Sequence, residues 1–133
     1  MDMPAIAQLT VTPLYAALLG LLFLPYTMRV GFYRLSSEIF IGNGDDPELL
    51  RRVRGQGNFV ETVPLALILI LTMELCGAGN TWLHAMGALL VFGRFSHYLG
   101  LTELGPKRLR PVGMFSTMGV YLVSSGWILV NTL

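Results

Sequence analysis

Four apolar stretches joined by short polar connections constrain this chain more than any other feature. They cover about residues 14–28, 59–76, 82–101 and 112–130. Each reaches the roughly 20 residues that a membrane-spanning helix needs, once its polar flank is counted as helix. Only 13% of the 133 residues are charged, against about 25% in soluble domains. The sequence therefore predicts an all-α integral membrane protein, with residues 1–133 forming a single bundle of four transmembrane helices.

Little of the chain is left for anything besides these helices. There is no room for a second domain or a soluble catalytic module. The segment GNGDD, residues 42–46, lacks the spacing of acidic ligands and the terminal glutamate of an EF-hand. We therefore expect no metal site. We also expect no nucleic-acid partner. The single cysteine, Cys76, excludes an intramolecular disulfide.

Basic residues are distributed unevenly between the connections. The first connection with its flanks and the third connection carry them, as Arg29, Arg34, Arg51, Arg52, Arg54, Lys107, Arg108 and Arg110. The second connection, GAGNT at 77–81, carries none. Because cytoplasmic loops are enriched in Lys and Arg, we expect the first and third connections in the cytoplasm and both chain ends outside. Glu74 and Glu103 lie near predicted helix ends, where we expect both to be solvated.

The second helix is predicted to begin well before its apolar run. Asp46 can cap a helix, Pro47 suits the first helical position, and Glu48 is favourable at the positive end of the helix. Pro25 and Pro64 fall inside the first two helices, where neighbouring helices compensate for the lost backbone bonds. Glycines in the last two helices indicate close helix contacts, and these are Gly87, Gly93, Gly113, Gly119 and Gly126.

Polar residues share one face of the second predicted helix. Arg54, Asn58 and Glu61 are four and three residues apart, which places them within about 60° of one another around the helix. Arg51 falls on the same stripe. Gln56 points to nearly the opposite side, so it would serve the same site only across an interface with another helix or subunit.

A second polar stripe lies on the third predicted helix, at Arg94, His97 and Tyr98. Arg94 is deep enough in the helix to face protein or a water-filled cavity rather than lipid. The simplest explanation of Glu61 is an ion pair with Arg94 or with Arg54 inside the bundle.

The single carboxylate of Glu61 does not require four arginines at the same membrane level, namely Arg51, Arg54, Arg94 and Arg110. Because arginine makes forked contacts with carboxylates, the surplus favours an anionic ligand. Glu61 and Asn58 would then bind ammonium and amide groups of that ligand. A zwitterionic peptide satisfies both requirements.

The segment RGQGNFVETVP, residues 54–64, is similar to the signature of the MAPEG family, the membrane-associated proteins in eicosanoid and glutathione metabolism. The Arg, Gln, Asn, Glu and Pro of that signature are matched by Arg54, Gln56, Asn58, Glu61 and Pro64. The segments GRFSHYLGL at 93–101 and KRLRPVG at 107–113 are also similar. The chain thus resembles a bacterial-type member related to the microsomal glutathione transferases.

The resemblance implies a left-handed four-helix bundle that assembles as a homotrimer, with glutathione between neighbouring subunits on the cytoplasmic side. It also implies a glutathione transferase or peroxidase of the bacterial inner membrane that acts on hydrophobic electrophiles. The implied glutathione-binding residues are Arg54, Asn58, Glu61, Arg94, His97 and Tyr98, with Gln56 contributed by the neighbouring subunit. Arg110 is similar to the arginine that activates the thiol, and Arg108 is the competing alignment.

Two alternative functions fit fewer of these residues. A non-catalytic, lipid-binding member of the same fold would not need the peptide-binding groups of Asn58 and Glu61. Leu101, however, stands where the family often has a tyrosine, so glutathione binding is better supported than catalysis. A small proton-coupled exporter also has four short helices, but its membrane glutamate would lie in the first of them, and arginines beside Glu61 would repel cationic drugs.

Overall fold

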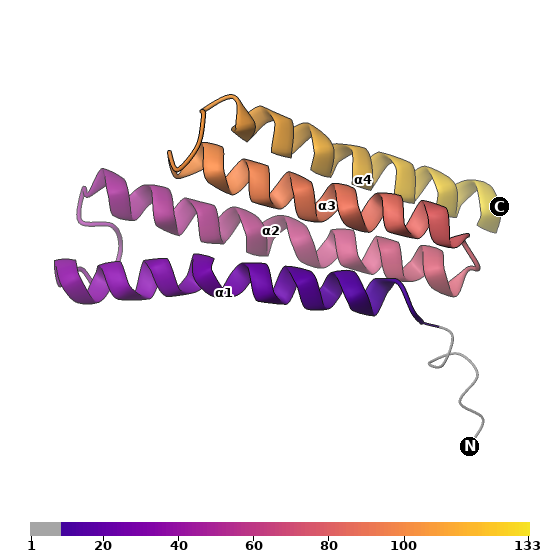
Figure 1. The fold of residues 1–133 in the computed structure, drawn as a ribbon, viewed down its shortest axis with the longest axis horizontal. Coiled ribbons are helices and arrows are strands. Elements are labelled where there is room, and N and C mark those ends of the chain that lie inside the picture. Colours follow the sequence, from indigo (N-terminus) through magenta and orange to yellow (C-terminus); the bar gives the residue numbers. More distant parts are fainter. Residues whose placement is uncertain (1–8) are drawn as a thin grey trace, which may run out of the picture.

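The chain folds into four α-helices that lie side by side (Figure 1). The computed structural model describes residues 9–133, and in them the helices are α1 (Thr12–Ser37), α2 (Pro47–Leu75), α3 (Asn80–Leu101) and α4 (Leu109–Thr132). No strand occurs within residues 9–133. Residues 38–46 and 102–108 connect helices at one end of the bundle, and residues 76–79 connect them at the other (Figure 1). The predicted all-α architecture with four helices is confirmed.

Three of the helices are long and apolar enough to cross a membrane. These are α1, α2 and α4, with 26, 29 and 24 residues. Their outward side chains include large apolar groups that are highly exposed, such as Phe115 at 71% and Leu122 at 76%, as lipid contact requires. Helix α3, with 22 residues, contains no stretch of 18 residues as apolar as those in the other three helices, and Arg94 and His97 lie within it. The four predicted spans are therefore confirmed for three helices, and the span of α3 stays a prediction.

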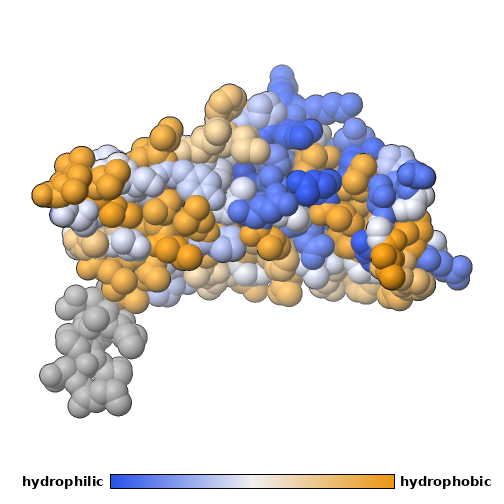
Figure 2. All heavy atoms as spheres, turned by 180° about the vertical axis from the view of Figure 1, so that it is seen from behind, coloured by the Kyte–Doolittle hydropathy of each residue, from blue (hydrophilic) through white to orange (hydrophobic). Residues whose placement is uncertain are grey.

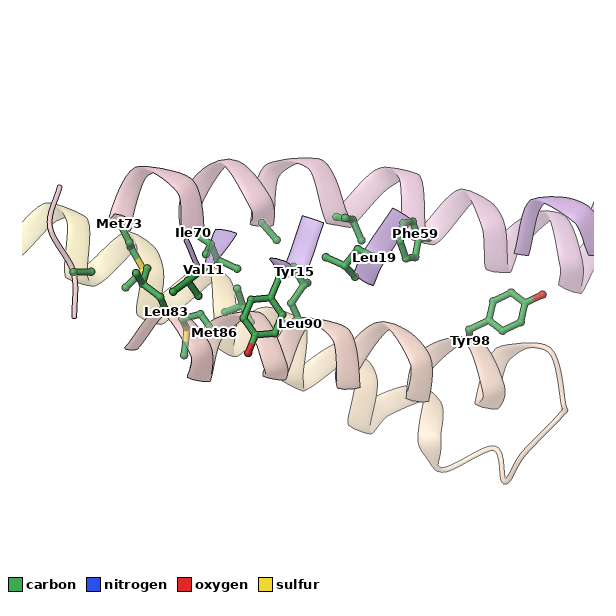
Figure 3. Packing of buried hydrophobic residues seen from close by; sticks show 14 of the residues in the cluster. Val11, Tyr15, Leu19, Phe59, Ile70, Met73, Leu83, Met86, Leu90 and Tyr98 are labelled. Atoms are coloured by element: carbon green, nitrogen blue, oxygen red, sulfur yellow. The ribbon is translucent and has the colours of Figure 1, made fainter. Parts of the chain in front are cut away.

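Apolar side chains from all four helices form the core. Figure 3 shows those of α1, α2 and α3 meeting along the bundle, with Leu19, Ile70 and Leu90 among them, each at most 1% exposed. From α4, Val120 joins the same cluster and is fully buried. The core therefore extends along the bundle and includes each helix.

Helices α3 and α4 approach each other closely at Gly93 and Gly113. A Cβ on Gly113 would lie 2.3 Å from the carbonyl oxygen of Gly93 and 2.5 Å from the backbone nitrogen of His97. Backbones come this close only where a side chain is absent, so the predicted close contact is confirmed at Gly93 and Gly113. It is wrong for Gly126, because no atom of residues 9–133 lies within 4 Å of its Cβ position.

Helix α2 begins at Pro47, as predicted. The carboxylate of Asp46 accepts the backbone N–H groups of Glu48 at 2.9 Å and Leu49 at 3.1 Å, and the hydroxyl of Tyr33 donates to it at 2.8 Å. The hydrogen bond from Leu49 and then that from Tyr33 hold the pKa of Asp46 below its usual range. The cap is therefore ionised at neutral pH, and it fixes the polar first turns of α2 against the end of α1.

At the opposite end of the bundle, Glu74 of α2 caps the beginning of α1. Its carboxylate accepts the backbone N–H groups of Thr10, Val11 and Thr12 at 2.7, 2.9 and 2.6 Å. Helix α1 has no side-chain cap of its own at Val11, and a negative group is favourable at a helix N-terminus. The expectation that Glu74 is only solvated is therefore wrong, because three otherwise unpaired donors of another helix lie beside it.

Replacing Glu74 by glutamine is expected to lower the free energy of unfolding by about 1–2 kcal/mol. A glutamine offers one neutral carbonyl oxygen to three N–H groups that now share a charged carboxylate. Amide hydrogen exchange at Val11 and Thr12 should accelerate as well. Glu38→Gln is the matched control, because Glu38 is exposed. Unchanged exchange in Glu74→Gln would contradict the assigned cap.

Candidate functional site

Arg54, Asn58 and Glu61 lie on one face of α2, as their spacing predicts, and we call these three residues the α2 polar face. The Nη1 and Nη2 atoms of Arg54 lie 3.4 and 3.5 Å from the two carboxylate oxygens of Glu61. The ion pair of Glu61 is thus with Arg54 and not with Arg94. The side chains of Arg54 and Glu61 are 52% and 57% exposed. On a helix of membrane-spanning length, such charges face a cavity or another protein surface rather than lipid.

The position of this pair along the helix sets it apart from the charged ends of the bundle. Glu61 is fourteen residues beyond Pro47 in a helix of 29 residues, which places it about 21 Å from the beginning of α2. Figure 2 shows hydrophilic side chains gathered at the end formed by residues 38–46 and 102–108, with the opposite end largely apolar. The α2 polar face therefore extends from a polar end to the middle of the bundle.

Arg94 of α3 lies behind this face and is only 2% exposed. Its Nη1 donates to the side-chain oxygen of Asn58 and, at 3.0 Å, to the hydroxyl of Thr62. Its Nη2 donates to the carbonyl oxygen of Gly113 in α4 at 3.1 Å. One buried guanidinium thus joins three helices. No acidic side chain within residues 9–133 pairs with it, so its positive charge is held by neutral acceptors alone.

The surroundings of Arg94 also fix the orientation of Asn58. Because Asn58 uses its side-chain oxygen as the acceptor for Arg94, its amide hydrogens remain available on the α2 polar face. Thr62 donates to the carbonyl of Asn58 at 2.7 Å, and the hydroxyl of Tyr121 donates to the carbonyl of Thr62. Sequence reasoning missed Thr62 and Tyr121. Thr62 could have been found from the sequence, because it lies one helical turn after Asn58. The contact of Tyr121 could not, because it depends on how α4 packs against α2.

His97 and Arg110 lie where α3 meets the first turn of α4. His97 is 3% exposed, and its Nδ1 is 3.2 Å from the backbone oxygen of Arg110. The side chain of Arg110 is exposed, and within the described part of the chain it forms no ion pair. It lines a cavity of about 400 Å³ to which Arg51 and Leu101 also contribute. Arg108 is likewise exposed but does not line that cavity.

Gln56 and Tyr98, in contrast, face α1. The amide of Gln56 donates to the hydroxyl of Thr27 at 3.1 Å. Tyr98 is 3% exposed and stacks on the ring of Tyr26, with a centroid separation of 3.5 Å. Its hydroxyl accepts from Nη1 of Arg29 at 2.8 Å. The subunit therefore brings Arg54, Asn58, Glu61 and Arg94 together, and it places Gln56 and Tyr98 on a different side of the bundle.

Comparison with known proteins gives matches at the level of a family. The model of the MAPEG family matches residues 12–130, which include all four helices. The inner membrane protein YecN of Escherichia coli K12 is 38% identical over 90 residues, a segment that makes up 68% of this chain and 69% of YecN. YecN of a second Escherichia coli strain, O6:H1, matches with the same identity and coverage.

Proposed function

The chain belongs to the MAPEG family, and from this premise we propose that it binds glutathione in the bacterial inner membrane and uses it as a transferase or peroxidase. Its second substrates would be hydrophobic electrophiles. The relative YecN is named as an inner membrane protein, and α1, α2 and α4 have the length and composition of membrane spans. We place α3 across the bilayer beside them. The positive-inside rule places residues 38–46 and 102–108 in the cytoplasm.

The exposed ion pair of Arg54 with Glu61, which lies at the middle of α2, is the observation that carries this proposal. Glutathione has one ammonium group, two carboxylates and two amides. Glu61 would take the ammonium group, Arg54 a carboxylate and Asn58 an amide. The N–O distances of 3.4 and 3.5 Å are longer than the roughly 2.7–2.9 Å of a strong charge-assisted hydrogen bond, so a ligand loses little by separating the pair.

Assembly into a homotrimer belongs to the same proposal. Two charged side chains that are more than half exposed would meet lipid at this depth in an isolated subunit, and such contact is unfavourable by several kcal/mol. A neighbouring subunit would shield them and close the glutathione site from its second side. In the assembled protein, Gln56 of that neighbour would add a further amide.

Arg110 would activate the thiol of glutathione. A guanidinium group near a thiol favours the thiolate, which is the nucleophile, and Arg110 has no ion-pair partner within residues 9–133. In conjugation the thiolate would attack an electrophilic carbon held beside it, forming a thioether as a leaving group departs or as the adduct takes up a proton. In reduction it would attack a peroxide oxygen, breaking the O–O bond and releasing an alcohol, and a second glutathione would convert the resulting sulfenic acid into the disulfide with loss of water. Arg108 is the alternative for this role, because it is exposed on the same segment.

A lipid-binding, non-catalytic member of the family is the second candidate. Leu101 lines the cavity beside Arg110 and cannot donate a hydrogen bond to a thiolate. In addition, an apolar groove of about 540 Å³ follows the outer face of α4, lined by Phe115, Met118, Gly119, Tyr121 and Leu122. Such a groove fits an acyl chain, either as a substrate or as a ligand that is not converted.

Replacing Glu61 by glutamine is expected to raise the dissociation constant for glutathione about tenfold or more, because an ionic contact to the ammonium group is lost. Calorimetric titration of the detergent-purified protein measures this change. Glu38→Gln is the matched control, since it removes an exposed carboxylate far from the α2 polar face. The proposal is contradicted if wild-type protein shows neither heat of binding nor thermal stabilisation at millimolar glutathione.

A further inference from the structure

A second polar feature lies nearer the end of the bundle than the α2 polar face. It is the cavity of about 400 Å³ beside the connection between α3 and α4, lined by Arg51, Gly100, Leu101, Glu103, Lys107 and Arg110. We call it the basic pocket. Its walls come from α2, from the last turn of α3, from the connection and from the first turn of α4, so residues distant in the sequence converge on one space.

The charges of the basic pocket do not balance. Three cationic side chains line it with a single carboxylate, that of Glu103. Glu103 is shared, because its oxygens lie 4.0 Å from Nη1 of Arg51 and 3.5 Å from Nζ of Lys107. Arg110 has no ion-pair partner in the described part of the chain. Arg51 also pairs at 3.0 Å with Glu48, which does not line the pocket. The remaining excess of positive charge is therefore that of Arg110, and it favours an anionic ligand.

The position of the pocket along α2 indicates where that ligand comes from. Arg51 is the fifth residue of a helix of 29 residues, about 44 Å long at 1.5 Å per residue. The hydrocarbon core of a bilayer is only about 30 Å thick, so the first turns of α2 extend to the level of the lipid headgroups. Leu104 and Val112, which follow closely on pocket residues, are 58% and 42% exposed and offer apolar contact next to the charges.

We propose that the basic pocket binds the phosphate group of an anionic phospholipid. Basic pockets between transmembrane helices are known to bind lipid phosphates at this level of the membrane. The excess of positive charge selects an anionic lipid over a zwitterionic one, and the neighbouring apolar side chains select a lipid over a soluble phosphate. This site is distinct from the α2 polar face, because Arg51 and Lys107 form no ion pair with Glu61 and lie outside residues 54–64. It shares Arg110 with the thiol-activating role proposed above, so its test uses Arg51 and Lys107 alone.

Native mass spectrometry of the detergent-purified full chain, titrated with phosphatidylglycerol, tests the proposal. Lys107→Gln is expected to weaken phosphatidylglycerol binding about fivefold, and the double variant with Arg51→Gln about 25-fold, at roughly one fivefold step per cationic group. The side chain of Lys107 is 84% exposed, so its replacement leaves the fold intact. Arg108→Gln is the matched control, because it removes an exposed positive charge from the same segment outside the pocket, and it should leave binding unchanged.

Three outcomes would overturn the proposal. Equal weakening by Arg108→Gln would show that lipid follows the overall surface charge. Equal binding of phosphatidylcholine would remove the selectivity for anionic lipids. Inorganic phosphate could stabilise the protein against heat at the same concentration as phosphatidylglycerol. If Lys107→Gln abolished that stabilisation, the pocket would be a site for soluble phosphate. Displacement of the lipid by glutathione would be a fourth such outcome, because it would assign the pocket to the glutathione site, whereas failure of glutathione to bind at all would leave the lipid result unaffected.

Discussion

Replacing Gly113 by alanine is expected to lower the free energy of unfolding by about 3 kcal/mol or more, because the new methyl group overpacks a rigid contact. Its Cβ would lie 2.3 Å from the carbonyl oxygen of Gly93 and 2.5 Å from the backbone nitrogen of His97. Both atoms belong to the backbone of α3, so no side-chain rotation relieves the overlap. The two helices must move apart, and the contact of Arg94 with the Gly113 carbonyl moves with them.

Equilibrium unfolding in mixed detergent micelles, followed by circular dichroism, measures this change. Gly126→Ala is the matched control on the same helix, where the new Cβ meets no atom of the described part of the chain within 4 Å. That substitution should stabilise the helix by about 0.5–1 kcal/mol, since alanine has the higher helix propensity. If Gly113→Ala unfolded like Gly126→Ala, the close approach of α3 and α4 would be wrong.

The second large effect is expected for Arg94→Ala, at about 3–5 kcal/mol of lost stability. The substitution empties a fully enclosed volume and removes the donor shared by Asn58, Thr62 and Gly113. Glutathione affinity should fall in the same variant, because Asn58 loses the contact that fixes its amide group. Unfolding and calorimetric titration, carried out on the same preparation, measure the two changes.

Arg54→Ala separates the effect on glutathione affinity from the effect on stability. Arg54 is 52% exposed and its pair with Glu61 is long, so its removal should change stability by less than about 1 kcal/mol. It should nevertheless weaken glutathione binding, because Arg54 faces the ligand. Equal stability of Arg54→Ala and Arg94→Ala would contradict the role of Arg94 as a buried connection between helices.

Features that depend on neighbouring residues in the sequence could be predicted well. The beginning of α2 follows from a capping aspartate directly before a proline, and both occupy the predicted positions at Asp46 and Pro47. The shared face of Arg54, Asn58 and Glu61 follows from the helical repeat alone. The same repeat places Gln56 on the other side of α2, where it meets Thr27 of α1.

Features that depend on how the helices rotate against one another could not be predicted. Spacing allowed Glu61 to pair with Arg94 or with Arg54, and only the packing of α3 against α2 and α4 gives Arg94 neutral partners instead. Tyr98 adjoins His97 in the sequence, but the turn of the helix directs it toward Tyr26 of α1. The cap that Glu74 provides joins residues more than 60 positions apart, a separation at which no local pattern gives a signal.

The dependence of Arg94 on two other helices affects how the protein is made. An arginine at the centre of a helix disfavours insertion into the membrane by about 2.5–3.5 kcal/mol when that helix enters alone, and α3, unlike its three neighbours, contains no 18-residue stretch apolar enough for a membrane span. Among residues 9–133, its buried guanidinium finds acceptors only on α2 and α4, and Gly93 and Gly113 allow α4 to pack tightly against α3. We therefore expect α3 to leave the translocon only after α4 has been synthesised, as a hairpin that docks on α2.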